Sequence, residues 1–202
     1  MKQTLYPKTE RIKPNKKQIT EKIDGSNIGF FKLNGELIIA QRNNVYTLTE
    51  IQNVKKDDLY KGLKNWLSEN AKNLTESLHE GSGFFGEWIG MGKLNYNFDF
   101  KVLMFAKANI KISESFYKVY NIYYDRKLFI YPFVNQIIPK YIGIVPLVKE
   151  LYECSIQDLD ELYDEYCALV NRPVEGFIII YNNDFIQKYV RCKNGKIEKN
   201  KW

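Results

Sequence analysis

The chain has 202 residues, a formal net charge of +6, and 45% hydrophobic residues. This length suits one substantial domain, and this composition excludes a disordered chain. The excess of Lys and Arg favours anionic partners, nucleic acid first. No run approaches the roughly 18–20 apolar residues of a membrane span, and the N-terminal residues contain no apolar region of the kind found in signal peptides. We therefore expect a cytoplasmic protein with no membrane partner.

The cysteines and the single histidine narrow the possible chemistry. Cys154, Cys167 and Cys192 are odd in number and widely spaced, which argues against a disulfide framework and a four-ligand zinc site. His79 is the only histidine, so a His-dependent catalytic triad has nothing else to draw on. Covalent catalysis would need a different nucleophile.

The first 18 residues are basic and are broken by Pro7 and Pro14. They could contact a phosphate backbone, or form a solvated lead-in. Shortly after them, Lys22 precedes Asp24-Gly25. Lysine becomes a good nucleophile only when its site favours the unprotonated amine. Taken alone, the stretch is better explained as a turn between strands with a solvated lysine.

Two apolar runs, 28–33 and 36–41, flank Asn34-Gly35. Asn-Gly between such runs is a strong signal for a β-hairpin, because both turn residues need positive φ. Arg42 stands at the far end of the returning strand. The hairpin therefore brings Arg42 back toward Lys22.

The remaining elements follow from periodicity. Apolar residues at three- and four-residue spacing predict helices over 57–78 and 155–170, the second with Ser155 as N-cap and Asp158 at N3. Apolar runs predict strands at 83–90, 100–106, 175–181 and 185–193, with strand and loop at 116–134.

Several strand residues could serve a reactive lysine. Glu87 lies between bulky apolar neighbours and needs a partner, and Glu175 opens a strand. Arg191 and Lys193 share one strand face, whereas Lys188 points the other way. One chemistry uses such a set: a lysine amine attacks the α-phosphate of a nucleoside triphosphate, and pyrophosphate leaves. Nearby cations hold the phosphate, and carboxylates hold a hard divalent metal, Mg²⁺ (or Mn²⁺).

The order of these residues resembles the covalent nucleotidyltransferases, which include polynucleotide ligases and mRNA capping enzymes. The matching motifs are Lys22-Ile23-Asp24-Gly25-Ser26-Asn27 for motif I, Phe85-Gly86-Glu87 for motif III, Phe105 for motif IIIa, Glu175-Gly176-Phe177-Ile178 for motif IV and Arg191-Cys192-Lys193-Asn194 for motif V. The asparagine that follows Gly25-Ser26, Asn27, resembles motif I of RNA ligases of the RNA ligase 2 type. The resemblance implies an α+β fold, an ATP-grasp-like core of antiparallel sheets with flanking helices.

The resemblance also implies roles. Lys22 would be the adenylated nucleophile and Glu175 the carboxylate at the metal. The implied ATP or AMP contacts are Glu21 with the adenine edge, Asn27 with metal-bound water, Arg42 with nucleotide and RNA end, Glu87 with ribose, Phe105 with the adenine face, and Arg191 and Lys193 with the α-phosphate.

The sequence departs from the family pattern at two positions. Arg191 stands where motif V usually has lysine, and Ala106 where motif IIIa usually has an acidic residue.

We expect residues 1–202 to form a single catalytic domain without a C-terminal OB or helical domain. RNA ends, nicked or single-stranded, would be the partners, together with an RNA-binding protein or the basic surface of the chain.

Three hypotheses result. The first is an ATP-dependent RNA ligase that joins 5′-phosphate and 3′-hydroxyl ends through lysyl-AMP. The second is a minimal DNA ligase or a capping guanylyltransferase, against which Glu21 and Asn27 argue. The third is a non-catalytic protein that binds RNA ends, favoured by Arg191 and Ala106. Labelling of the protein by ATP, by GTP or by neither distinguishes the three.

Overall fold

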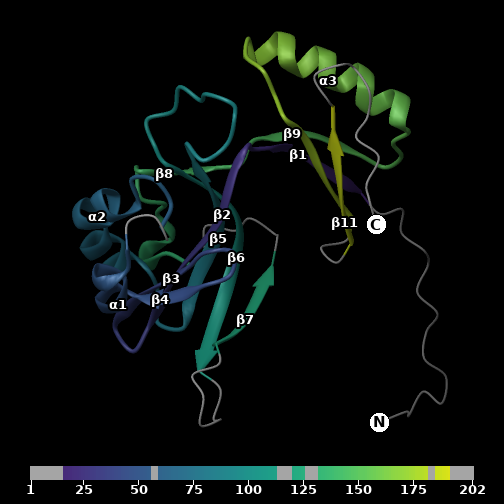
Figure 1. The fold of residues 1–202 in the computed structure, drawn as a ribbon. Helices are drawn as coiled ribbons and strands as arrows, with labels where there is room; N and C mark the ends of the chain where they lie inside the picture. Colours follow the sequence, from purple (N-terminus) through teal and green to yellow (C-terminus); the bar gives the residue numbers. More distant parts are fainter. Residues whose placement is uncertain (1–15, 56–58, 113–119, 126–131, 182–184, 192–202) are drawn as a thin grey trace, which may run out of the picture.

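The computed structural model describes residues 16–55, 59–112, 120–125, 132–181 and 185–191. It confirms a mixed α+β architecture built on two largely antiparallel sheets. The two sheets lie side by side, with α1 and α2 beside the larger sheet and α3 across the smaller one (Figure 1).

The larger sheet carries the hairpin and the strand with Glu87. Its main path is β4-β3-β2-β5-β6-β7, and β8 pairs with β6 in parallel. Its strands are β2 (Gly25–Leu33), β3 (Glu36–Ala40), β4 (Val45–Thr47), β5 (Ser82–Ile89), β6 (Val102–Ile112), β7 (Tyr120–Asp125) and β8 (Ile142–Ile144).

Two helices and a short turn support this sheet. They are α1 (Leu48–Asn53), α2 (Leu63–Ser77) and the 3₁₀ turn η2 (Val134–Gln136). Helix α2 buries Trp66, Leu67 and Leu74 against Phe30 of β2 and Phe84 of β5 in one core. No helix among the described residues is long and apolar enough to cross a membrane.

The smaller sheet carries the candidate nucleophile. Its order is β11-β10-β1-β9, formed by β11 (Phe185–Val190), β10 (Gly176–Tyr181), β1 (Lys17–Lys22) and β9 (Leu147–Leu151). Helix α3 (Ile156–Val170) covers one face, where Leu162 and Tyr166 pack with Ile19 and Phe177. Side chains alternate along a strand. Glu21 therefore faces α3 with Ile19, and Lys22 faces away from it.

Two chain segments join the sheets at the same place. Ile23 and Asp24 link β1 to β2, while Val145 and Pro146 link β8 to β9. The Val145 N–H donates to the Met104 carbonyl of β6 at 2.9 Å. The Glu21 N–H donates to the Pro146 carbonyl at 3.0 Å. The second crossing segment is thus hydrogen-bonded to the end of β1 on one side and to β6 of the larger sheet on the other.

Most of the predicted elements are present. The hairpin is confirmed, with φ of 53° at Asn34 and 75° at Gly35. Helix α3 is confirmed with its Ser155–Asp158 capping box. The helix predicted over 57–78 begins only at Leu63, because Gly62 has a left-handed backbone (φ 83°) and forms its N-cap. Much of 116–134 lies outside the described residues.

Candidate active site

Lys22 ends β1 directly opposite the start of β10, where its cross-strand partner is Gly176. Its ammonium forms an ion pair with Glu175, and both side chains are about one quarter exposed. Gly176 has φ of 156°, and a Cβ there would overlap the Tyr189 carbonyl of β11. A glycine is therefore required next to Glu175 for β10 and β11 to meet at this point.

Glu87 reaches the same site from the larger sheet. It lies on β5 opposite Asn27 of β2. Burial raises the pKa of the Glu87 carboxyl to about 7; the ammonium of Lys22 opposes this shift, and the carboxylates of Glu175 and Asp24 add to it. These influences mean that Glu87, Lys22 and Glu175 share one electrostatic environment although they come from different sheets.

Asp24, which sequence reasoning passed over, fixes the segment that follows β5. Its carboxylate accepts the backbone N–H groups of Lys93 and Leu94, the latter at 2.8 Å. Its own backbone N–H donates to the Tyr96 hydroxyl at 2.8 Å. The Asp of the Lys-x-Asp-Gly motif therefore has a structural task, which no local pattern signals because its partners lie 69 and 70 positions away in the chain.

Arg42 and Asn27 are brought together by Tyr60, a second residue that sequence reasoning missed. The Arg42 backbone N–H donates to the Tyr60 hydroxyl at 3.3 Å. That hydroxyl donates to the Asn27 backbone carbonyl at 2.8 Å. Burial raises the pKa of Tyr60, and nearby Glu87 acts in the same direction. Tyr60 therefore joins the β3–β4 turn to the strand that faces Glu87.

Phe105 lies on β6 where the pairing with β5 shifts register, at a β-bulge between Phe85 and Gly86. Bulges re-aim the side chain of the extra residue. The Phe105 ring is half-buried and packs with a small cluster that includes Ile23, the residue after Lys22. It is thus close to the candidate nucleophile, and its contact with an adenine stays a prediction.

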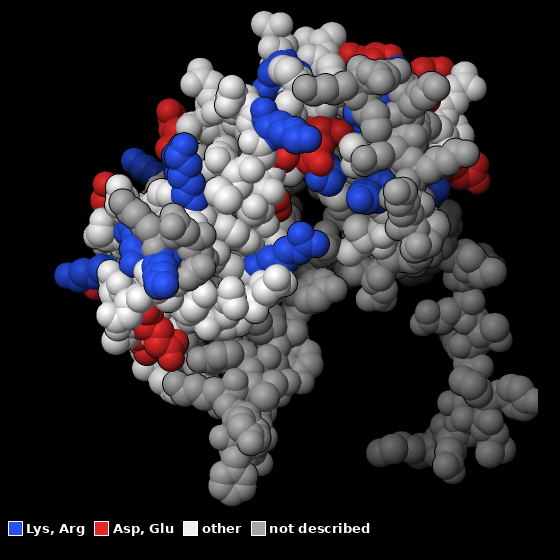
Figure 2. Space-filling view, in the orientation of Figure 1, with Lys and Arg blue, Asp and Glu red and all other residues white. Residues whose placement is uncertain are grey.

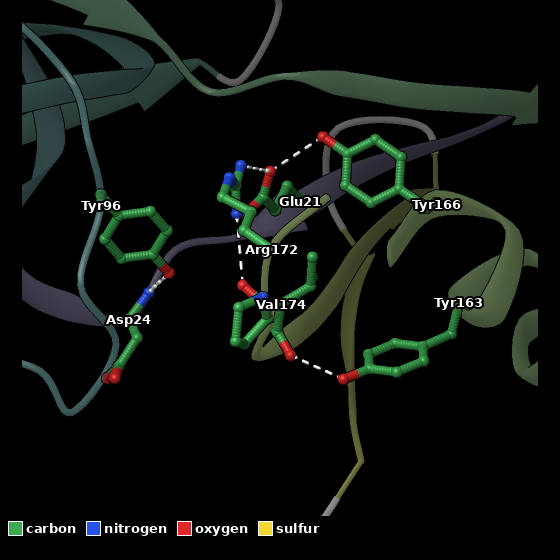
Figure 3. A network of polar contacts seen from close by, with 8 residues as sticks. Glu21, Asp24, Tyr96, Tyr163, Tyr166, Arg172 and Val174 are labelled. Carbon is green, nitrogen blue, oxygen red and sulfur yellow. Dashed lines mark hydrogen bonds and ion pairs between the residues drawn. The ribbon is translucent and has the colours of Figure 1, made fainter. Parts of the chain in front are cut away.

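Glu21 lies on the opposite face of β1 from Lys22. Its side chain is fully buried, and both carboxylate oxygens are hydrogen-bonded by Arg172 and Tyr166 (Figure 3). A contact between Glu21 and an adenine edge stays a prediction. In this arrangement such a contact would require both partners to be displaced.

Arg191 also lies on the α3 side of the smaller sheet. It forms ion pairs with Asp160 and Asp164 of α3, and its guanidinium lies 5.1 Å from the Tyr163 ring centroid. The structure therefore does not bring Arg191 to Lys22, and its phosphate contact stays a prediction. Lys193 lies outside the described residues. Lys188, whose cross-strand partner is Ile178, points to the same face of the smaller sheet as Lys22.

The profile of the RNA ligase family matches residues 15–194. The chain belongs to the RNA ligase family. A comparison with curated proteins found no match. The match spans the strand with Lys22, the larger sheet and the strand with Glu175, so it includes all the residues brought together here. Family membership supports a ligase that acts on RNA.

The donor groups at the site suit a magnesium-type ion. Across the described part of the chain, no three His, Cys, Asp or Glu side chains form a metal-binding cluster. Magnesium usually takes one or two protein carboxylates, with water and substrate phosphates as the other ligands. Glu175 and Glu87 fit that pattern, because Glu175 pairs with Lys22 and the carboxyl of Glu87 lies near enough to both for their charges to act on its pKa.

The surface between the sheets suits an anionic ligand. Figure 2 shows a hollow between the two halves of the molecule, with Lys and Arg side chains of both halves around it and carboxylates among them. Opposite charges at such a site can hold phosphate and metal together.

Proposed function

We propose that the protein is an ATP-dependent RNA ligase in which Lys22 is adenylated. The observation that supports this best is the meeting of Lys22, Glu175 and Glu87 at the junction of two sheets in a member of the RNA ligase family. The lysine supplies a covalent intermediate without a histidine, which agrees with the single His79 of this chain.

The reaction has three steps. The Lys22 Nζ attacks the α-phosphorus of ATP, the bond to the β-phosphate breaks, and pyrophosphate leaves. The 5′-phosphate of an RNA then attacks the same phosphorus, which frees Lys22 and forms an adenylated RNA end. Finally the 3′-hydroxyl of a second end attacks the 5′-phosphate, and AMP leaves as the phosphodiester forms.

Residues of this chain would support each step. Glu175 holds the Lys22 amine at the end of β1 before reaction. Glu175 and Glu87 would hold Mg²⁺ or Mn²⁺, which supplies neutralisation of phosphate charge when bound. Arg42, tied to Asn27 through Tyr60, is available to contact nucleotide or RNA phosphate because its side chain is exposed. The half-buried Phe105 ring offers a stacking surface.

Incubation with α-labelled ATP or GTP and Mg²⁺ or Mn²⁺ tests the proposal. We expect covalent label from ATP and not from GTP. The label should be absent in Lys22→Ala and retained in Lys101→Ala, which removes an exposed lysine. Sealing of pre-adenylated RNA ends, compared with DNA ends, then tests the substrate. Label from GTP would favour a capping enzyme, and no label from either nucleotide would favour a protein that only binds RNA ends.

A further inference from the structure

A buried ion pair lies beside the candidate nucleophile. Arg172, in the turn after α3, donates to both carboxylate oxygens of Glu21, from Nη1 at 2.6 Å and from Nη2 at 2.7 Å (Figure 3). The Tyr166 hydroxyl donates to the same carboxylate at 2.8 Å. A buried carboxylate is costly unless it is paired and hydrogen-bonded, and here it has three donors.

The same guanidinium contacts the loop after β5. It lies 5.1 Å from the ring centroid of Tyr96 and 5.4 Å from that of Phe98, which are distances of cation–π contact. The two rings are nearly parallel, with centroids 5.3 Å apart. Tyr96 in turn accepts the Asp24 backbone N–H. A chain of contacts therefore runs from Glu21 through Arg172 and Tyr96 to Asp24.

This chain of contacts spans Lys22. It holds the residue immediately before Lys22, whose side chain lies on the face opposite to that of Lys22, and the residue two positions after Lys22. Arg172 also precedes Glu175 by three residues, so one short segment supplies both the guanidinium and the carboxylate that pairs with Lys22. Fixing the backbone on both sides of a nucleophile limits where its amine can lie.

We propose that Arg172 is a positioning residue for Lys22, and that Glu21 acts through Arg172 rather than by contacting the nucleobase. This inference rests on the proposed function. Both Glu21 oxygens are occupied, and a base contact would leave a guanidinium of low exposure without its partner. Breaking one side of such a pair is strongly destabilising.

Arginine and lysine variants separate positioning from simple charge. Arg172→Lys keeps the charge but loses the planar fork that contacts both Glu21 oxygens. We expect the single-turnover rate of lysyl-AMP formation to fall about 10-fold in this variant, with the KM for ATP changed less than about 2-fold. Tyr96→Leu should lower the rate in the same way. Glu150→Gln, which breaks an exposed ion pair on the same sheet, is the control.

Glu21→Gln tests the second half of the inference. Its label yield from ATP relative to GTP should equal that of the unaltered protein, while its rate falls as in Arg172→Lys. A rise in GTP labelling of about 10-fold or more would overturn the inference and assign base recognition to Glu21. An unchanged rate in both Glu21→Gln and Arg172→Lys would also overturn it.

A chemical measurement keeps the inference separate from the proposed function. An amine-directed acylating reagent and mass spectrometry report the modification rate of Lys22 in the absence of nucleotide. We expect a change of about 3-fold or more at Lys22 in Arg172→Lys, and none at the exposed Lys101. If the unaltered protein forms no lysyl-AMP, the proposed function fails. The inference then stands or falls on this modification rate, which must differ between the variant and the unaltered protein.

Discussion

The amine of Lys22 pairs with the carboxylate of Glu175, although 153 positions separate the two residues in the chain. The pair exists because β1 and β10 are neighbours and Lys22 lies opposite Gly176. A lysine on the first strand thereby meets a carboxylate that lies near the other end of the chain. The candidate site is a product of the sheet topology as much as of the Lys-x-Asp-Gly stretch.

Glu175→Gln should separate the charge of this carboxylate from its size. We expect lysyl-AMP formation to slow on the order of 10²-fold, because both the ion pair and a metal ligand lose their charge. Stability should change by less than about 1 kcal/mol, since the pair is partly exposed. Label incorporation over time is the measurement, with the exposed Glu165→Gln as control. A loss smaller than 10-fold would argue against the metal role.

Glu87 should make stability depend on pH. Its pKa is about 7 in the folded protein against 4.5 for the free carboxyl. Between these values the folded state binds a proton that the unfolded state has released, so the free energy of unfolding falls as pH rises. The total decline is roughly 2–4 kcal/mol, complete above about pH 7.

Glu87→Gln should remove this decline, so that the variant gains stability over the unaltered protein at pH 8 compared with pH 5. Urea denaturation at the two pH values measures it, with Glu69→Gln, an exposed carboxylate of α2, as the matched control. Equal pH dependence in Glu87→Gln and the unaltered protein would show that Glu87 titrates normally.

The sequence patterns identified local structure well and long-range partners poorly. Asn34-Gly35 and the Ser155–Asp158 box act within a few residues, and the structure has both. The Thr47–Glu50 capping box of α1 was equally readable and was missed. Gly62 shows what apolar periodicity cannot predict. Its left-handed backbone makes it the N-cap, so the helix begins at Leu63 although the apolar pattern extends further toward the N-terminus.

At the site, the family order of motifs brought Lys22, Glu87 and Glu175 into one prediction. Periodicity alone could not have done so, since it carries no information on which strands pair. Arg172 was invisible for the same reason: nothing near it in the chain signals that Glu21, 151 positions away, is its partner. The alternation of side chains along a strand correctly placed Lys188 and Arg191 on opposite faces of the sheet. It could not tell which of these faces is the one that carries Lys22.

Asp24→Ala should loosen the loop that follows β5. The substitution removes the carboxylate that accepts two backbone N–H groups, at a cost of about 2–3 kcal/mol in stability. The exposed Lys93 should then become a site of rapid tryptic cleavage. Asp99→Ala, at an exposed position of the same loop, should cleave like the unaltered protein. Equal protection in both variants would mean that Asp24 does not hold this loop.

Gly25→Ala should disturb the pairing of β2 with β5. A Cβ at this position would overlap the Trp88 carbonyl and lie 2.9 Å from the Glu87 Cγ. We expect a loss of roughly 1–3 kcal/mol, as for other overpacked sites, and slower lysyl-AMP formation because Glu87 must shift. Ser26→Ala, the next residue on β2, removes only a hydroxyl and serves as the comparison in thermal denaturation. A Gly25→Ala protein as stable as Ser26→Ala would contradict this account of the strand contact.

Arg191→Ala should affect α3 more than the reaction at Lys22. The guanidinium pairs with Asp160 and Asp164 and lies over Tyr163, all on the face of β11 opposite to the one shared with Lys22. We expect stability to fall by about 1 kcal/mol, because these pairs are partly exposed. Lysyl-AMP formation should stay within a few-fold of the unaltered protein when both are compared well below their melting temperatures. If label formation drops about 100-fold in a protein that is still folded, Arg191 leaves α3 and contacts the α-phosphate, as the motif V resemblance implies.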